Sequence, residues 1–201
     1  MAKSFYAEGR PQNGLAYEDY LTLMQQQVEQ ANTGAFDEEA RRLHGYIELN
    51  FQRSSRIQRT YRVPQDLRAQ IAAIATPQLW MVLTEPWCGD SAQCLPYIAK
   101  FAACNSAIDL RILPRDQNLD IMDQYLTNGS RGIPKLVAFD RAGQELFQWG
   151  PRPVEAAELF AKEKEAGLIK EEIMEKLHLW YGRNRGKAIE KEFLEIFSKL
   201  K

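Results

Sequence analysis

The chain has 201 residues, of which 45% are hydrophobic and 10% aromatic, so it is long enough to bury a core of ordinary domain size. Its 26 Lys and Arg residues nearly balance 27 Asp and Glu residues, and the formal net charge of -1 gives no global attraction to nucleic acid or to an anionic membrane. No run approaches the roughly 18 apolar residues of a membrane span, and the N-terminus lacks a signal-peptide core, so we expect a soluble, cytoplasmic protein without nucleic-acid or membrane partners.

The first 76 residues are expected to be mainly helical. Polar residues interrupted by Gly and Pro predict an irregular lead-in over residues 1–16. Apolar residues then recur at helical spacing over 17–30, until Asn32-Thr33-Gly34 ends the pattern. Asp37 is placed to cap a second helix, which gives a helical hairpin, and residues 65–74 predict a further short helix. The helical spacing of the second helix is carried by Leu43, Tyr46, Ile47 and Phe51.

Four arginines follow at intervals of three residues. They are Arg53, Arg56, Arg59 and Arg62. One interpretation is a basic strip that binds phosphate, nucleic acid or an acidic partner. The other is a solvated helix face paired with nearby acids, and we favour it because neither a nucleic-acid motif nor a set of stacking aromatics accompanies the arginines.

From residue 77 the pattern alternates between strands and helices. A continuous apolar run indicates a strand buried on both faces, and strict alternation indicates a strand with one wet face. The expected elements are a strand at 79–83, a helix at 92–104, a strand at 108–113, a short helix at 118–126, a hairpin of strands at 135–139 and 145–149, and helices at 154–165, 168–181 and 187–200.

The turn after the strand at 79–83 carries Trp87-Cys88-Gly89-Asp90. The dipole and unpaired amide groups of a helix N-terminus stabilise a thiolate, so this position predicts a lowered pKa for Cys88. The thiolate is the nucleophile in disulfide exchange, which makes Cys88 the principal candidate catalytic residue. The chain has only two other cysteines, Cys94 and Cys104, and the odd total favours a reducing compartment.

Two signatures of this segment resemble the thioredoxin superfamily. Trp87-Cys88-Gly89, with Pro96 eight residues after the cysteine, is similar to the thioredoxin active-site helix. Arg131-Gly132-Ile133-Pro134, before a strand and the turn at Gly143, is similar to the cis-proline loop of that superfamily. The resemblance covers residues 77–165, and bacterial thioredoxin-like proteins with a Trp-Cys-Gly-Asp motif are similar to it.

The resemblance implies an α/β, thioredoxin-like fold, in which a central mixed sheet is flanked by helices, with added N- and C-terminal helices. It divides the chain into a helical extension at 1–76, a thioredoxin-like domain at 77–165 and C-terminal helices at 166–201 that pack on the core. It also implies a cis Ile133–Pro134 bond, with the main chain of Ile133 pairing with an extended substrate beside Cys88. The implied substrate-binding residues are Trp87, Gly89, Asp90, Ile133, Pro134 and Gly150.

The motif departs from thioredoxins at three positions. Ser91 stands where thioredoxins have the resolving cysteine, although its hydroxyl can still donate to the Cys88 thiolate. Asp90 replaces the usual proline and opposes the thiolate, and Val82 stands where the family has a buried aspartate. Cys94 is a candidate resolving thiol, but six helical residues advance about 9 Å along the axis, so we favour a buried structural role for it.

Three functions stay open at this point. The favoured one is a thiol-disulfide protein in which Cys88 forms mixed disulfides with protein or low-molecular-weight thiols, and an external thiol resolves them. The second is a redox-inactive binding or scaffold module, and the third is a dithiol oxidoreductase using Cys88 and Cys94. His44 and His178 lie outside the thioredoxin-like segment, and no metal-ligand spacing occurs, so we expect no metal and no other cofactor.

Overall fold

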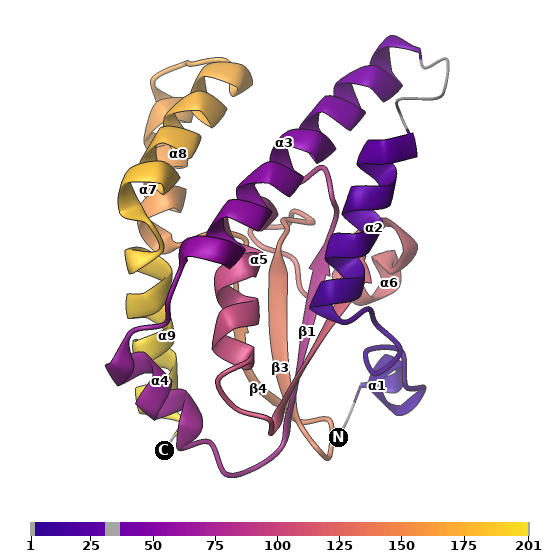
Figure 1. The fold of residues 1–201 in the computed structure, drawn as a ribbon, viewed down its shortest axis with the longest axis vertical. Coiled ribbons are helices and arrows are strands. Elements are labelled where there is room, and N and C mark those ends of the chain that lie inside the picture. Colours follow the sequence, from indigo (N-terminus) through magenta and orange to yellow (C-terminus); the bar gives the residue numbers. More distant parts are fainter. Residues whose placement is uncertain (1–2, 31–36, 201) are drawn as a thin grey trace. The chain divides into compact units, whose positions relative to one another are not determined.

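The computed structural model describes residues 3–30 and 37–200, and Figure 1 shows its fold. Within it, the chain divides into two compact units, Met1–Pro151 and Arg152–Lys201. A mixed sheet with strand order β2-β1-β3-β4 forms the centre of the first unit. β1 (Gln78–Thr84) runs parallel to β2 (Ile108–Pro114) and antiparallel to β3 (Lys135–Asp140), and β4 (Glu145–Trp149) pairs antiparallel with β3. The expected α/β class and mixed sheet are confirmed.

β1 is one of the two inner strands of the sheet. Its apolar run is buried on both faces, and strands pair with both of its edges. The strand ends at Thr84, and residues 85–88 turn the chain into α5 (Gly89–Ala102). Almost every residue of α5 is buried, since α3 crosses over it as Figure 1 shows. Residues 85–91 therefore lie at the carboxyl end of the central strand.

The helices described before the sheet are α1 (Ser4–Ala7), α2 (Tyr17–Gln30), α3 (Glu38–Thr60) and α4 (Gln65–Ala72). The hairpin of α2 and α3 is confirmed, because the two helices pack together and the Asp37 carboxylate accepts the Ala40 N–H at 2.8 Å. The expected helix end at Asn32-Thr33-Gly34 lies outside the described residues. The expected irregular lead-in is wrong in part, because α1 forms and places Phe5 in the core, edge-on to Phe139.

The inward stripe of α3 is partly polar. Asn50 and Ser54 are 1% and 3% exposed, whereas Leu43 and Tyr46, which carry part of the apolar pattern, are 42% and 48% exposed. Buried amide and hydroxyl groups require hydrogen-bond partners, so these two side chains must find theirs in the layer beneath α3.

The polar stripe of α3 donates to the main chain around α5. Pro96 lies inside α5 and has no N–H, so the carbonyl of Ala92 lacks its usual helical donor. The Ser54 hydroxyl donates to that carbonyl at 3.5 Å, and Asn50 Nδ2 donates to the carbonyl of Pro86 at 3.1 Å. α3 therefore supplies hydrogen bonds on both sides of the turn between β1 and α5.

The segment between β2 and β3 is less helical than expected. A 3-10 turn at Arg115–Gln117 precedes α6 (Leu119–Met122), so the helix predicted at 118–126 is wrong in its length. The chain leaves the helix after Met122, and Tyr125 enters the core, where its hydroxyl donates to Glu145 on β4 at 2.8 Å. This tyrosine ties the segment to the edge strand.

The second unit consists, in the described residues, of α7 (Val154–Glu165), α8 (Lys170–Asn184) and α9 (Lys187–Lys199), as the sequence predicts. Arg185 and Gly186 adopt positive φ angles of 53° and 88°, which end α8 and begin α9. An ion pair between Lys176 and Glu163 joins α8 to α7. In residues 3–30 and 37–200, no helix combines the length and apolar character needed to cross a membrane.

We predict that Asn50→Ala lowers the free energy of unfolding by about 2 kcal/mol, because it leaves the buried carbonyl of Pro86 without a donor. Chemical denaturation of the purified protein measures the change. Gln52→Ala on the exposed side of α3 is the matched control and should change stability by less than about 0.5 kcal/mol. Equal stabilities of the two variants would contradict the role given to Asn50.

Candidate functional site

The candidate site forms where β1 gives way to α5. Cys88 is the N-cap residue of α5, and this residue is buried, with 8% of its surface exposed. The thiol donates to the carbonyl oxygen of Ile133, with Sγ and O 3.3 Å apart. The Ile133–Pro134 peptide bond is cis. The structure therefore brings Cys88 to the loop that precedes β3, across 45 residues of sequence.

The environment of Cys88 disfavours its thiolate. Burial raises the pKa of Cys88 to about 11, and the nearby Asp90 carboxylate acts in the same direction. A hydrogen bond from Ser91 lowers the pKa of Cys88, but this effect offsets only part of the increase. The expectation of a lowered pKa is therefore wrong, because the loss of hydration outweighs the helix terminus. At neutral pH, Cys88 is a thiol.

A chain of hydroxyl groups lies behind the sulfur. Thr84, the last residue of β1, donates its hydroxyl to Ser91 Oγ at 2.5 Å, and Ser91 hydrogen-bonds Cys88. Tyr20 on α2 hydrogen-bonds Thr84, and burial raises the pKa of its phenol. Ser91 thus lies beside Cys88 as its position in the motif predicts, whereas the sequence analysis did not identify Thr84 and Tyr20 as site residues. The only signal for Tyr20 was its place on the apolar face of the predicted helix.

Gly150 lies directly against the proline loop. Its φ angle is +107°, and a Cβ atom at this position would come within 2.1 Å of the Pro134 carbonyl oxygen. A Cβ atom on Gly132 would similarly lie 3.1 Å from Pro151 Cγ. Glycine is required at position 150 because only a residue without a side chain permits this approach. The structure places Ile133, Pro134 and Gly150 together.

Trp87 borders the site and contacts a residue that the sequence did not single out. The Arg115 guanidinium lies 5.0 Å from the centroid of the Trp87 ring, and its Nη1 donates to the carbonyl of Arg131 at 3.3 Å. The buried Glu85 carboxylate accepts the Asp116 N–H at 2.8 Å, and burial raises the pKa of Glu85. Arg115 therefore connects Trp87 to the loop that leads into the cis peptide.

Other candidate residues lie apart from this cluster. Cys94 is 1% exposed inside α5, and Cys104 follows the C-terminal end of the same helix. His44 Nε2 lies 3.2 Å from the Val28 carbonyl oxygen, between α3 and α2, and His178 belongs to the second unit. Among the described residues, no disulfide joins the cysteines and no group of three or more potential metal-ligating side chains gathers. Gly89 and Asp90 form the first turn of α5 and stay predicted substrate contacts.

The mixed sheet, the cysteine at the start of the helix after the central strand and the proline loop facing its sulfur define a thioredoxin-fold protein. A family model described as Thioredoxin matches residues 37–165, more than half of the chain. The protein therefore belongs to the thioredoxin family. The match begins at the N-cap of α3, so it includes the helix that donates to Pro86 and Ala92.

Solved structures share the fold. A protein of unknown function from Pseudomonas aeruginosa is 14% identical with a TM-score of 0.60, over 95% of this chain and 96% of that one. An HIV epitope-scaffold is 17% identical with a TM-score of 0.56, over 77% of this chain and 90% of the scaffold. No curated protein matches the sequence significantly. These likenesses establish the thioredoxin-like fold, which confirms the fold predicted from the two motifs.

We predict opposite effects of two substitutions beside Cys88. Asp90→Asn removes a negative charge that raises the pKa of the thiol, so the pKa should fall and alkylation at pH 8 should accelerate. Ser91→Ala removes a hydrogen bond that favours the thiolate, so the pKa should rise and alkylation should slow. Each unit of change in the pKa of Cys88 alters its thiolate fraction about tenfold at a pH below that pKa.

The measurement is the rate of iodoacetamide labelling at Cys88, followed by mass spectrometry as a function of pH. In the unmodified chain the rate should climb with pH and level off only near 11. A plateau near neutral pH, or changes of the same sign in the two variants, would disprove this account of the electrostatics.

We also predict that Gly150→Ala lowers the free energy of unfolding by at least about 2 kcal/mol, because the new Cβ atom meets the Pro134 carbonyl at a positive φ angle. Gly45→Ala is the control. It lies on the exposed side of α3 with no atom within 4 Å of its Cβ position, so stability should rise by about 0.5–1 kcal/mol. Thermal or chemical denaturation compares the two, and a neutral Gly150→Ala would refute the close approach.

Proposed function

We propose that this protein is a thiol-disulfide exchange protein of the bacterial Trp-Cys-Gly-Asp type, working in the cytoplasm through Cys88 alone. The observation that carries the proposal is the 3.3 Å hydrogen bond from the Cys88 thiol to the carbonyl of Ile133. It directs the sulfur at the main chain that would pair with an extended substrate. Trp87, Gly89, Asp90, Pro134 and Gly150 form the surroundings of that substrate.

The reaction needs one thiol from the protein and one from outside. Cys88 loses its proton to solvent, and the thiolate attacks one sulfur of a protein or low-molecular-weight disulfide. A bond forms between Cys88 and that sulfur, and the other sulfur leaves as a thiolate. An external thiol then attacks the mixed disulfide and releases Cys88. The substrate disulfide is exchanged, the external thiol is consumed, and the protein returns unchanged.

Substrate binding acts on the hydrogen bond that holds Cys88. The Ile133 carbonyl accepts the Cys88 S–H, so a substrate strand that pairs with Ile133 competes for this acceptor. A thiol that loses its partner is easier to deprotonate than one whose S–H is bonded. The raised pKa then describes the resting protein, and binding of a disulfide lowers the barrier to exchange.

We predict that incubation with a small aromatic disulfide produces a mixed disulfide on Cys88, visible as one mass adduct that an added monothiol removes. Cys88→Ser should abolish the adduct and the release of the aromatic thiol. Cys94→Ser and Cys104→Ser are the controls and should retain both. An adduct that persists in Cys88→Ser, or turnover that requires Cys94, would overturn the single-cysteine mechanism.

The second candidate function is a redox-inactive binding module, and the burial of Cys88 with its pKa near 11 favours it. In that case Cys88 acts as a hydrogen-bond donor that fixes the Ile133 loop. Partner proteins would then bind equally well to the unmodified chain and to Cys88→Ser, and the disulfide assay would show no release of thiol. The dithiol alternative would instead give a Cys88–Cys94 linkage after oxidation.

A further inference from the structure

A second candidate site lies at the other end of α5 from Cys88. A cavity of about 320 Å³ opens between the end of α3, the segment after it, α4 and the end of α5. This volume lies at the small end of the range for ligand sites, about 300–1,000 Å³. The 14 residues of α5 separate the cavity from Cys88 by roughly 20 Å of helix. The cavity is therefore independent of the proposed exchange site.

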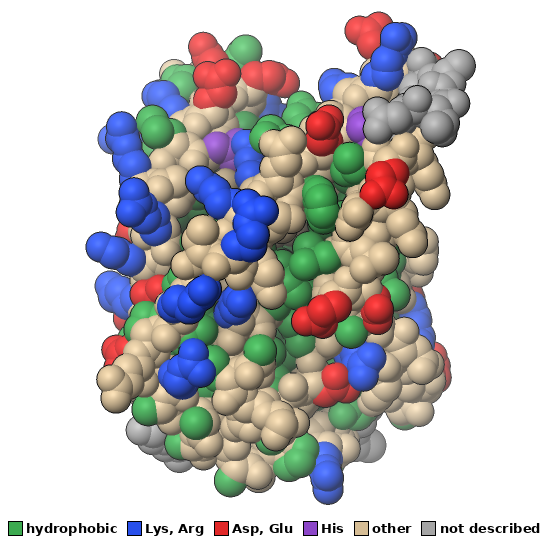
Figure 2. All heavy atoms as spheres, viewed as in Figure 1, with side chains coloured by type: hydrophobic (Ala, Val, Ile, Leu, Met, Phe, Trp, Pro, Cys, Tyr) green, Lys and Arg blue, Asp and Glu red, His purple; other side chains and the backbone are tan. Residues whose placement is uncertain are grey.

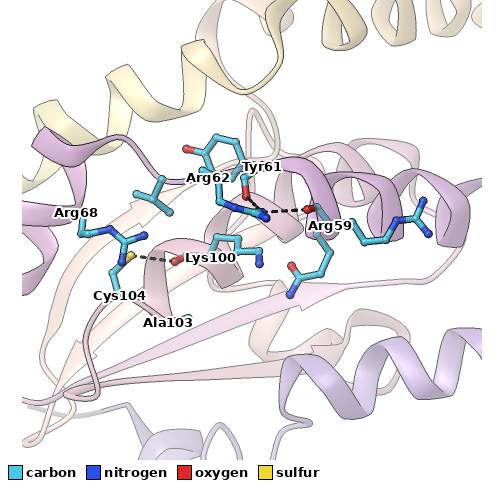
Figure 3. A pocket seen from close by; sticks show the side chains of 9 residues that line it. Arg59, Tyr61, Arg62, Arg68, Lys100, Ala103 and Cys104 are labelled. Atoms are coloured by element: carbon cyan, nitrogen blue, oxygen red, sulfur yellow. Dashed lines mark hydrogen bonds between the residues drawn. The ribbon is translucent and has the colours of Figure 1, made fainter.

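The lining of the cavity is basic. Four cations line it, and none of the described residues that line it is acidic. The cations are Arg59, Arg62, Arg68 and Lys100. Figure 3 shows Arg68 beside Cys104, and Arg62 near Lys100 with its guanidinium hydrogen-bonded to the carbonyls of Arg59 and Tyr61. Figure 2 shows Lys and Arg side chains gathered around the end of α3, with few acidic side chains among them. Like charges gathered on one surface repel one another, and an anion bound among them would offset that repulsion.

The lining cations also lack the acidic partners that arginines have elsewhere in the chain. Among the described residues, no ion pair involves the four lining cations. Aspartates pair with four other arginines, namely Arg10, Arg111, Arg115 and Arg131. The sequence interpretation of the four arginines from Arg53 to Arg62 as a solvated face is confirmed for Arg56, Arg59 and Arg62, which are exposed. The expected pairing with nearby acids is wrong, since none of the four forms an ion pair in the described part of the chain.

Helix dipoles account for the positions of only some of these cations. Lys100 lies in the last turn of α5, and Arg62 Nη1 donates to the carbonyls of Arg59 and Tyr61 at 3.0 and 2.9 Å, as cations near helix C-termini do. Arg68 is different, because it lies in the first half of α4, where the dipole disfavours a cation. Arg68 is exposed and lines the cavity, where a bound negative group would offset this unfavourable helix position.

A hydrogen-bond acceptor completes the lining. Gln58 contributes to the cavity wall, and its buried Oε1 has no hydrogen-bond partner among residues 3–30 and 37–200. Buried acceptors are nearly always satisfied, so this oxygen is matched to a donor that arrives with a ligand. A ligand that matches this lining carries a negative charge and also an O–H or N–H group that can donate to Gln58.

We propose that this cavity binds a small organic phosphate, with Arg62, Arg68 and Lys100 contacting the phosphoryl oxygens and Gln58 accepting a hydrogen bond from the organic part. A phosphoryl group offers three acceptor oxygens and nearly two charges, which match guanidinium forks better than a single carboxylate does. The cavity lies outside the exchange site, so the proposal stands or fails separately from the function of Cys88.

The test is titration of the full chain with glycerol phosphate by calorimetry at low ionic strength, with malonate as the dicarboxylate comparison. Arg68→Gln and Lys100→Gln should each weaken phosphate binding at least about tenfold, because each removes a charged hydrogen bond. Arg56→Gln is the control, since this arginine is exposed on α3 and does not line the cavity. It should change the affinity less than about twofold.

Cys104 gives a second readout, because its thiol lines the cavity. Glycerol phosphate should slow maleimide labelling of Cys104, measured on its peptide, in the unmodified chain and not in Arg68→Gln. No heat and no protection at millimolar glycerol phosphate would overturn the proposal. So would equal binding by the two lining variants and the unmodified chain, or malonate binding as tight as that of glycerol phosphate.

Discussion

Three buried carbonyl oxygens around the turn between β1 and α5 must each receive a hydrogen bond, and the arrangement of the site depends on how they do. The Cys88 thiol donates to the Ile133 carbonyl. The Asn50 side chain donates to that of Pro86, and the Ser54 hydroxyl donates to that of Ala92. One donor is the candidate nucleophile, and the other two come from α3. The N-terminal helices are therefore part of the site's construction, which agrees with a family match that begins at residue 37.

The same constraint sets the chemistry of Cys88. A sulfur that donates to a carbonyl from a buried position is held in one orientation, and it gives up a hydrogen bond when it ionises. Orientation and ionisation thus compete at this residue. Burial and Asp90 shift the balance toward the neutral thiol, and the hydrogen bond from Ser91 shifts it back in part. Reactivity in this protein depends on what a bound partner does to that balance.

The sequence predicted the parts that periodicity and turn motifs encode. Apolar runs located the four strands, and Trp87-Cys88-Gly89 and the loop ending at Pro134 located the two segments that meet. Burial of a side chain by distant segments is not written in local spacing, so the pKa of Cys88 was predicted in the wrong direction. For the same reason, the sequence analysis did not single out Asn50 and Ser54, and it did not link Arg68 to the arginines of the preceding helix.

Pro96 has a consequence for how related sequences should vary. The proline has no N–H to donate to the carbonyl of Ala92, and the hydroxyl of Ser54 donates to that carbonyl instead. A homologue with an ordinary residue at position 96 closes its own helix and no longer needs a hydroxyl at position 54. We therefore expect these two positions, 42 residues apart in the chain, to vary together among related sequences.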